Sequence, residues 1–204
     1  MTQPLPPATQ TAADEAKLGA HTHTFLPRFK KEPQRLDLFD NGVVVEQQDG
    51  SLLPIPWNDM LVYEGITSRS SVVSRNYTLC HTDGRSAFLT DWKGAREFGP
   101  IINTAVAKVW VPHHLKRVAE GTPWVLVDIA GKPKSKLAIS KDGLEAGRNF
   151  YPWAKVRSVG AEVGSLYVKV AGKFTPVAYP AVHIYNFHAA LLVAKHFHER
   201  AQDS

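Results

Sequence analysis

The chain has 204 residues, of which 44% are apolar and 21% charged. This composition is typical of a globular protein and excludes a fibrous one. Cys80 is the single cysteine, which excludes an intramolecular disulfide and a thiolate metal cage. The formal net charge of +5 lies wholly in the second part, because residues 1–120 hold 13 basic and 13 acidic side chains whereas residues 121–204 hold 11 and 6. That asymmetry favours an anionic partner, either nucleic acid or an acidic lipid surface.

The chain begins with MTQPLPPATQTAADEA. This stretch lacks the basic start, apolar run and cleavage site of a signal peptide, and no run in the sequence reaches the ~18 apolar residues of a membrane span. We therefore expect a disordered tail over residues 1–17 and a cytoplasmic protein, with association to a membrane surface as the alternative.

A strand candidate at residues 22–28 opens the first of two similar halves. The stretch RLDLFDNGVVV, residues 35–45, predicts a strand, a tight turn and a second strand, because Asn-Gly supplies the positive φ that a two-residue hairpin requires. IPWNDM and then YTLCHTDGRSAFLT, residues 55–60 and 77–90, predict further strands and another hairpin. Apolar residues then recur at helical spacing around Gly99-Pro100, and Pro112 is expected to bend or end that helix.

The same motifs return in the same order in the second half. They are a strand candidate at 123–129, KLAISKDGLEA at 136–146, YPWAKV at 151–156, YVKVAGKFTPVA at 167–178, and a final helix that Asn186 can cap. A preserved order at unequal spacing indicates an internal duplication. The predicted organisation is a tail at 1–17, a domain at 18–111, a helical linker at 112–121, a second domain at 122–200 and a tail at 201–204.

Meandering antiparallel strands followed by an amphipathic helix resemble the pleckstrin-homology (PH)-like barrel. The motifs L-x-[LI]-x-x-[ND]-G-[VL], [IY]-P-W-x-x-[MV] and VHIYNFHAALLV are similar to those of an uncharacterised bacterial family with tandem PH-like domains, over residues 18–200. The resemblance implies a mainly β (α+β) fold with two tandem antiparallel β-barrels, each closed by a C-terminal α-helix. It brings no established reaction, ligand or catalytic residue.

Trp57 and Trp153 each follow a proline in the same context. They could be aromatic platforms for a ligand or a base, or anchors of a corner in the fold, where a buried ring donates its N–H to a carbonyl. The duplication explains both tryptophans at once and favours the structural interpretation. Gly42 and Gly143, as turn residues, and Asn186, as a helix cap, are likewise interpreted as structural.

Basic residues recur between the first two strands of each copy. In PH-like domains that bind phosphorylated lipid headgroups, basic residues in and beside this loop contact phosphate oxygens. The alternative is that lysines keep hairpin tips solvated and discourage edge pairing. By this resemblance of location, the candidate anion- or lipid-binding residues are Arg28, Lys30, Lys31, Arg35, Lys132, Lys134 and Lys136.

Three histidine pairs, at 21/23, 113/114 and 196/198, do not predict a metal site, because no cysteine or acidic residue stands at a ligand-like spacing. No nucleophile elbow, phosphate-binding glycine loop or His-Glu-x-x-His motif is present. We therefore expect no cofactor, no metal and no enzymatic activity. The leading hypothesis is a non-catalytic adaptor or scaffold that binds a protein or peptide through strand edges or a groove beside a helix. The second is attachment to anionic lipids through the basic loops, and the third is nucleic-acid binding by the basic second half.

Overall fold

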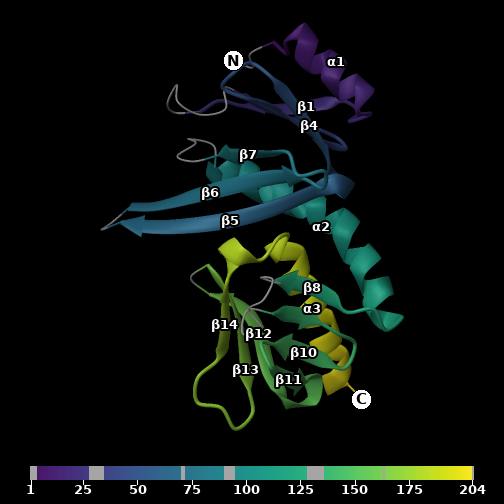
Figure 1. Ribbon diagram of the computed structural model, residues 1–204, viewed down its shortest axis with the longest axis vertical. Helices are drawn as coiled ribbons and strands as arrows, with labels where there is room; N and C mark the ends of the chain where they lie inside the picture. Colours follow the sequence, from purple (N-terminus) through teal and green to yellow (C-terminus); the bar gives the residue numbers. More distant parts are fainter. Residues whose placement is uncertain are drawn as a thin grey trace. The chain divides into compact units, whose positions relative to one another are not determined.

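The computed structural model describes residues 4–27, 35–69, 72–89, 95–127, 136–162 and 164–203. These form two compact units, residues 1–106 and 107–204. The fold is α+β: each unit contains two antiparallel sheets followed by a helix that packs on strands (Figure 1).

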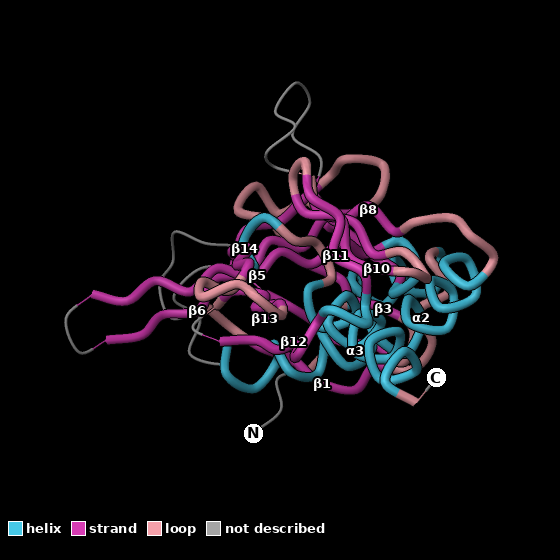
Figure 2. The backbone as a smooth tube through the Cα atoms, turned by 90° about the horizontal axis from the view of Figure 1, so that it is seen from below, coloured by secondary structure: helices cyan, strands magenta, loops and turns pink. Residues whose placement is uncertain are grey.

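The first unit opens with a short helix and continues with seven strands. Four strands form a sheet in the order β1-β2-β3-β4, and three form a second sheet in the order β5-β6-β7, with every neighbouring pair antiparallel. The ribbon of β5 and β6 extends well beyond β7 (Figure 1), and Figure 2 shows the same two strands running side by side. The elements are α1 (Pro7–Glu15), β1 (His21–Phe25), β2 (Arg35–Phe39), β3 (Gly42–Glu46), β4 (Leu52–Pro56), η1 (Trp57–Asp59), β5 (Met60–Arg69), β6 (Val72–His81), β7 (Ser86–Leu89) and α2 (Ala95–Ala119).

The second unit repeats this order. Its four-stranded sheet runs β11-β10-β9-β8 and its three-stranded sheet runs β12-β13-β14. The predicted duplication is confirmed. The elements are β8 (Trp124–Val127), β9 (Leu137–Ile139), β10 (Gly143–Ala146), β11 (Asn149–Pro152), η3 (Trp153–Lys155), β12 (Val156–Glu162), β13 (Ser165–Val170), β14 (Val177–Pro180), η4 (Ala181–His183) and α3 (Phe187–Gln202).

The predicted closed barrels are wrong. Within the described residues, no strand of a four-stranded sheet pairs with a strand of the three-stranded sheet in the same unit. The chain passes from one sheet to the next through the one-turn 3-10 helix at the Pro-Trp motif, η1 in the first unit and η3 in the second. Each unit is therefore a pair of open sheets that meet at this corner.

The hairpins form where the sequence predicts them, but their glycines act for a different reason. Neither Gly42 nor Gly143 has a positive φ. A Cβ at Gly42 would lie 2.5 Å from the carbonyl oxygen of Ile55, and one at Gly143 would lie 2.4 Å from that of Tyr151. Both carbonyls immediately precede the Pro-Trp corner, so glycine is required because the two backbones approach closely.

The segment predicted to be a disordered tail contains α1. Ala13 and Leu18 are fully buried and pack against Phe39 and Val44. Phe39 and Val44 lie on one face of the four-stranded sheet, and Leu36 and Leu38 lie on the other, because side chains alternate along a strand. Because α1 covers this face, every residue of β2 is buried.

Helix α2 runs without a break through Pro112 to Ala119, so the predicted linker is the last part of the same helix. A proline inside a helix removes one hydrogen bond, and here that loss does not end the helix. Phe98 near its start is fully buried and contacts the rings of Phe25 and Tyr77 in the first unit. Val118 near its end belongs to the hydrophobic core of the second unit.

The second unit has one extended hydrophobic core between its sheets and α3. Trp153 and the helix residues Val193 and Phe197 belong to it. Asn186 occupies the N-cap position of α3 but makes no capping hydrogen bond with its side chain. Its backbone is left-handed, with φ 49°, which asparagine tolerates better than most residues. Its role at this position is conformational.

Candidate functional site

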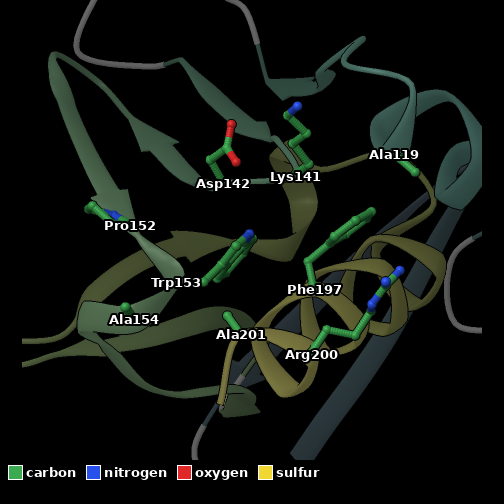
Figure 3. Close-up of a pocket in the computed structure, with 9 residues that line it drawn as sticks. All are labelled: Ala119, Lys141, Asp142, Pro152, Trp153, Ala154, Phe197, Arg200 and Ala201. Carbon is green, nitrogen blue, oxygen red and sulfur yellow. The ribbon is translucent and has the colours of Figure 1, made fainter. Parts of the chain in front are cut away.

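A pocket of about 520 Å³ opens beside α3 in the second unit (Figure 3). In Figure 3 the residues of the β9–β10 turn lie on one side of the pocket and the last turns of α3 on the other, with Trp153 and Phe197 between them. The lining residues are Ala119, Lys141, Asp142, Pro152, Trp153, Ala154, Phe197, Arg200 and Ala201.

Backbone and side-chain hydrogen bonds hold the walls of this pocket in place. The amide of Trp153 donates to the carbonyl of Asp142 over 3.1 Å, and its indole Nε1 donates to the carbonyl of Ser140 over 3.0 Å. At the helix end, His198 bonds to the carbonyl of Val156 over 3.0 Å and Gln202 Nε2 donates to that of Trp153 over 3.4 Å. The turn, the corner and the end of α3 are thus joined through Trp153.

The pocket combines an apolar floor with a charged rim. Trp153 is 1% exposed and Phe197 is 6% exposed, whereas Lys141, Asp142 and Arg200 are exposed to solvent. Such a surface can bury an apolar side chain and pair with a carboxylate. The nine lining residues include no serine, cysteine or histidine. The arrangement therefore supports binding of a ligand that combines an apolar group with a negative charge.

The single cysteine lies elsewhere, on β6 of the first unit. Burial raises the pKa of the Cys80 thiol above its ordinary value, although a hydrogen bond with Ser86 lowers it in part. A raised thiol pKa keeps the sulfur protonated near neutral pH, and the protonated form is a poor nucleophile. The Cys80 thiol is therefore a poor nucleophile in this fold.

Two of the seven predicted anion-binding residues lie in the described part of the chain, and both contact carboxylates. Arg35 is 6% exposed, and its Nε donates to Asp37 Oδ2 over 2.6 Å. Lys136 Nζ lies 2.8 Å from Glu145 Oε2, with both side chains partly exposed. Arg28, Lys30, Lys31, Lys132 and Lys134 lie outside the described residues. Binding of anionic lipids through these loops, and of nucleic acid by the basic second half, stay predictions.

The two predicted corner residues have similar geometry. Trp57 is buried, its amide donates to the carbonyl of Asn41 over 2.9 Å, and its indole Nε1 donates to the carbonyl of Asp40 over 2.9 Å. In the second unit the amide of Trp153 donates to the equivalent residue, Asp142, whereas its indole Nε1 donates to the carbonyl of Ser140, one position before the equivalent of Asp40. Both indoles thus join the β2–β3-type turn to the following corner.

Among the paired histidines, His21 lies beside a carboxylate and His114 packs against aromatic rings. His21 Nε2 lies 3.2 Å from the buried carboxylate of Asp37. His114 stacks on Trp124, with ring centroids 3.7 Å apart and the planes inclined by 4°, and also contacts Trp110 and His113. Across the described ranges, no group of three His, Cys, Asp or Glu side chains could hold a metal ion.

Sequence reasoning missed the pocket and the environment of His114. The one available signal for His114 is Trp110, which lies four residues earlier and therefore on the same helix face. His114 Nε2 is buried and has no hydrogen-bond partner among the residues that the structure describes. Burial, and then the charges of His113 and Arg117, lower the pKa of His114 to about 4. Lys141, Phe197 and Arg200 carry no sequence signal for a pocket, because separate elements bring them together.

Comparisons with known proteins found no match, either to a protein-family model or to a curated protein. Of the helices in the described ranges, none is long and apolar enough to cross a membrane.

Proposed function

We propose that the protein is a non-catalytic adaptor or scaffold with two tandem PH-like units, and that the pocket beside α3 binds a peptide segment of a protein partner. The observation that carries this proposal is the composition of the pocket. An apolar floor made by Trp153 and Phe197 lies beside two cationic side chains, Lys141 and Arg200, and the nine lining residues include no serine, cysteine or histidine. Clefts beside helices are a recurrent site for peptide recognition.

The PH-like part of this proposal is supported by the order of the elements. Each unit has four strands in one antiparallel sheet, three in a second, and then a helix packed on strands. The same order in both units, with a Pro-Trp corner between the sheets, is the arrangement that the resemblance implies, in an open form.

A peptide-display selection tests the proposed binding. The purified full chain is used to select from a random peptide library, and the affinity of each recovered peptide is measured by fluorescence anisotropy. We expect peptides that combine an apolar and an acidic residue. Their affinity should fall about tenfold or more when Lys141→Glu and Arg200→Glu are combined, since a reversed charge repels a carboxylate across the rim.

The matched control combines Arg157→Glu and Lys169→Glu, two exposed cations on β12 and β13 of the same unit. This variant has the same net charge as the pocket variant, and we expect affinities within about twofold of the unaltered chain. Recovery of no binding peptide would overturn the proposal. So would peptides that bind equally well to the pocket variant and the unaltered chain.

A further inference from the structure

The β2–β3 turn of the first unit shows how a chain segment can bind at this position. The amide of Asp40 donates to the carbonyl of Ala20 over 3.0 Å, and the amide of Asn41 donates to that of Leu18 over 2.8 Å. Residues 18–20 thus run along the turn. The two accepting carbonyls are two residues apart, and Gly19 between them has a positive φ of 82°. Leu18 from this segment is fully buried.

The equivalent turn of the second unit lacks such a neighbour. When Gly42 is aligned with Gly143, Asp40 and Asn41 correspond to Lys141 and Asp142. The backbone amides of the corner tryptophans agree with this alignment, because that of Trp57 donates to Asn41 and that of Trp153 donates to Asp142. The amides of Lys141 and Asp142 donate to no residue in the ranges that the structure describes. Both residues line the pocket.

The length of the connection that precedes β8 differs. Both helices end in the same reversal, with the amide of Leu18 donating to the carbonyl of Ala13 and that of Thr122 to the carbonyl of Arg117, each over 2.9 Å. The left-handed residue Lys17 is then followed by residues 18–20 before β1 begins, whereas the left-handed Gly121 is followed by residues 122–123 before β8 begins. The shorter connection leaves the turn amides open, and Ala119 forms a wall of the pocket.

We propose that the pocket binds an acidic peptide, which lies along the β9–β10 turn as residues 18–20 lie along the β2–β3 turn. This inference rests on the function proposed above. Two peptide carbonyls, two residues apart, accept hydrogen bonds from the amides of Lys141 and Asp142. An apolar side chain of the peptide enters the pocket against Trp153 and Phe197.

The side chains of the two turns indicate why the peptide is acidic. In the first unit, Asp40 Oδ2 accepts a hydrogen bond from the amide of Ala20 over 3.1 Å. In the second unit, Lys141 stands in the place of Asp40, and a lysine only donates. Arg200 lines the same pocket from α3. A ligand complementary to this turn therefore supplies a carboxylate, where the first unit supplies an N–H group.

Amide hydrogen exchange followed by NMR tests this inference on the full chain, with the peptides recovered from the selection as probes. On saturation with peptide, we expect exchange of the Lys141 and Asp142 amides to slow about tenfold or more, because each gains an acceptor. The amides of Arg157 and Lys169, in strands β12 and β13 of the same unit, serve as internal controls and should change less than twofold. Peptides with a free or an amidated C-terminus distinguish a terminal carboxylate from an acidic side chain.

Two results separate this inference from the proposed function. If peptides lose affinity with the Lys141→Glu and Arg200→Glu variant but leave exchange of the two turn amides unchanged, the pocket binds peptides in another geometry and this inference is overturned alone. If peptides that lack any carboxylate bind as tightly as acidic ones, the acidic specificity is overturned. If no peptide binds in the pocket, both proposals fall together.

Discussion

His114 is held uncharged by its surroundings. Its ring is 6% exposed, stacks on Trp124 and lies near the cationic side chain of Arg117, so protonation would place a charge in an apolar site. The folded state therefore binds a proton more weakly than the unfolded state does. The contribution to stability is complete above the unfolded pKa of 6.5 and is lost as the pH falls towards about 4.

We predict that this residue costs the protein about 3 kcal/mol of stability between pH 6.5 and pH 4. His114→Phe keeps a stacked ring without a proton to bind, so its free energy of unfolding should vary less over this interval. Urea unfolding at several pH values measures the difference between the two proteins, which cancels the contribution of the carboxylates. Parallel pH profiles for the two proteins would contradict the prediction.

Gly143 is the subject of a second prediction at the scale of a residue. Gly143→Ala should lower the free energy of unfolding by about 1–3 kcal/mol, because the added Cβ would lie 2.4 Å from the carbonyl oxygen of Tyr151. This carbonyl can shift only if the adjoining Pro152-Trp153 corner shifts with it. Gly160→Ala on β12 is the control, since a Cβ added there would meet no heavy atom within 4 Å and the φ of Gly160 is not positive. Equal urea midpoints for the two variants would refute the steric explanation.

Individual residues show why sequence prediction succeeds only in part. The turn motif identifies Gly42, yet the close approach of Ile55 depends on strand pairing, which a local pattern does not contain. The resemblance to PH-like domains places Arg35 in an exposed basic loop, yet Arg35 is 6% exposed at the start of β2. Its partners Asp37 and Thr24 lie beside it because β1 and β2 pair, which a local pattern does not contain either.

At the scale of elements, α1 acts as a cover for the four-stranded sheet of the first unit. Leu18→Ala should destabilise this unit by about 2–4 kcal/mol, because it removes a fully buried side chain from the contact with Phe39 and Val44. Hydrogen exchange with mass spectrometry should show faster exchange in β2 and β3 and little change in β9 and β10. Leu192→Ala, at a position that is 40% exposed on α3, is the matched control.

Most strands and the later helices can be predicted from periodicity, because their apolar faces repeat with a clear period. Helix α1 cannot, since only Thr9 and Ala13 within it are buried and its composition is that of a solvated segment. The continuation of α2 through Pro112 escapes prediction for a different reason. Proline disfavours a helix locally, whereas Val118 and the residues packed beside it stabilise the helix beyond that point.

At the scale of the whole molecule, one helix supplies side chains to two hydrophobic cores. Phe98→Ala should destabilise the first unit by about 3–5 kcal/mol, because the ring is fully buried among aromatic side chains. We expect exchange to accelerate in β5 and β6 while β12 and β13 change much less. Ile101→Ala, on the same helix and 37% exposed, is the control. Equal acceleration in the two units would show that they unfold as one.

The duplication is the feature of the whole molecule most accessible from the sequence, because motifs in a fixed order survive changes in loop length. The pocket is not accessible in this way. It depends on two differences between the copies. The connection before β8 is shorter, and Lys141 occupies the position that Asp40 has in the first unit. An alignment of the two repeats rests on the positions that they share, so it does not reveal a position that differs. A new binding surface can nevertheless arise where the repeats have diverged.

The shared helix α2 also determines where this chain can be divided. The division between the two compact units falls inside the helix, between Val106 and Ala107. The buried residues Phe98, Ile102 and Val106 lie before this point, whereas Ala107 and Val118 lie after it, in the core of the second unit. A cut here would leave each core its own side chains but would break the helix, and backbone N–H and C=O groups at the two new ends would lose their partners. Fragments that end at this point are therefore expected to fray at the cut.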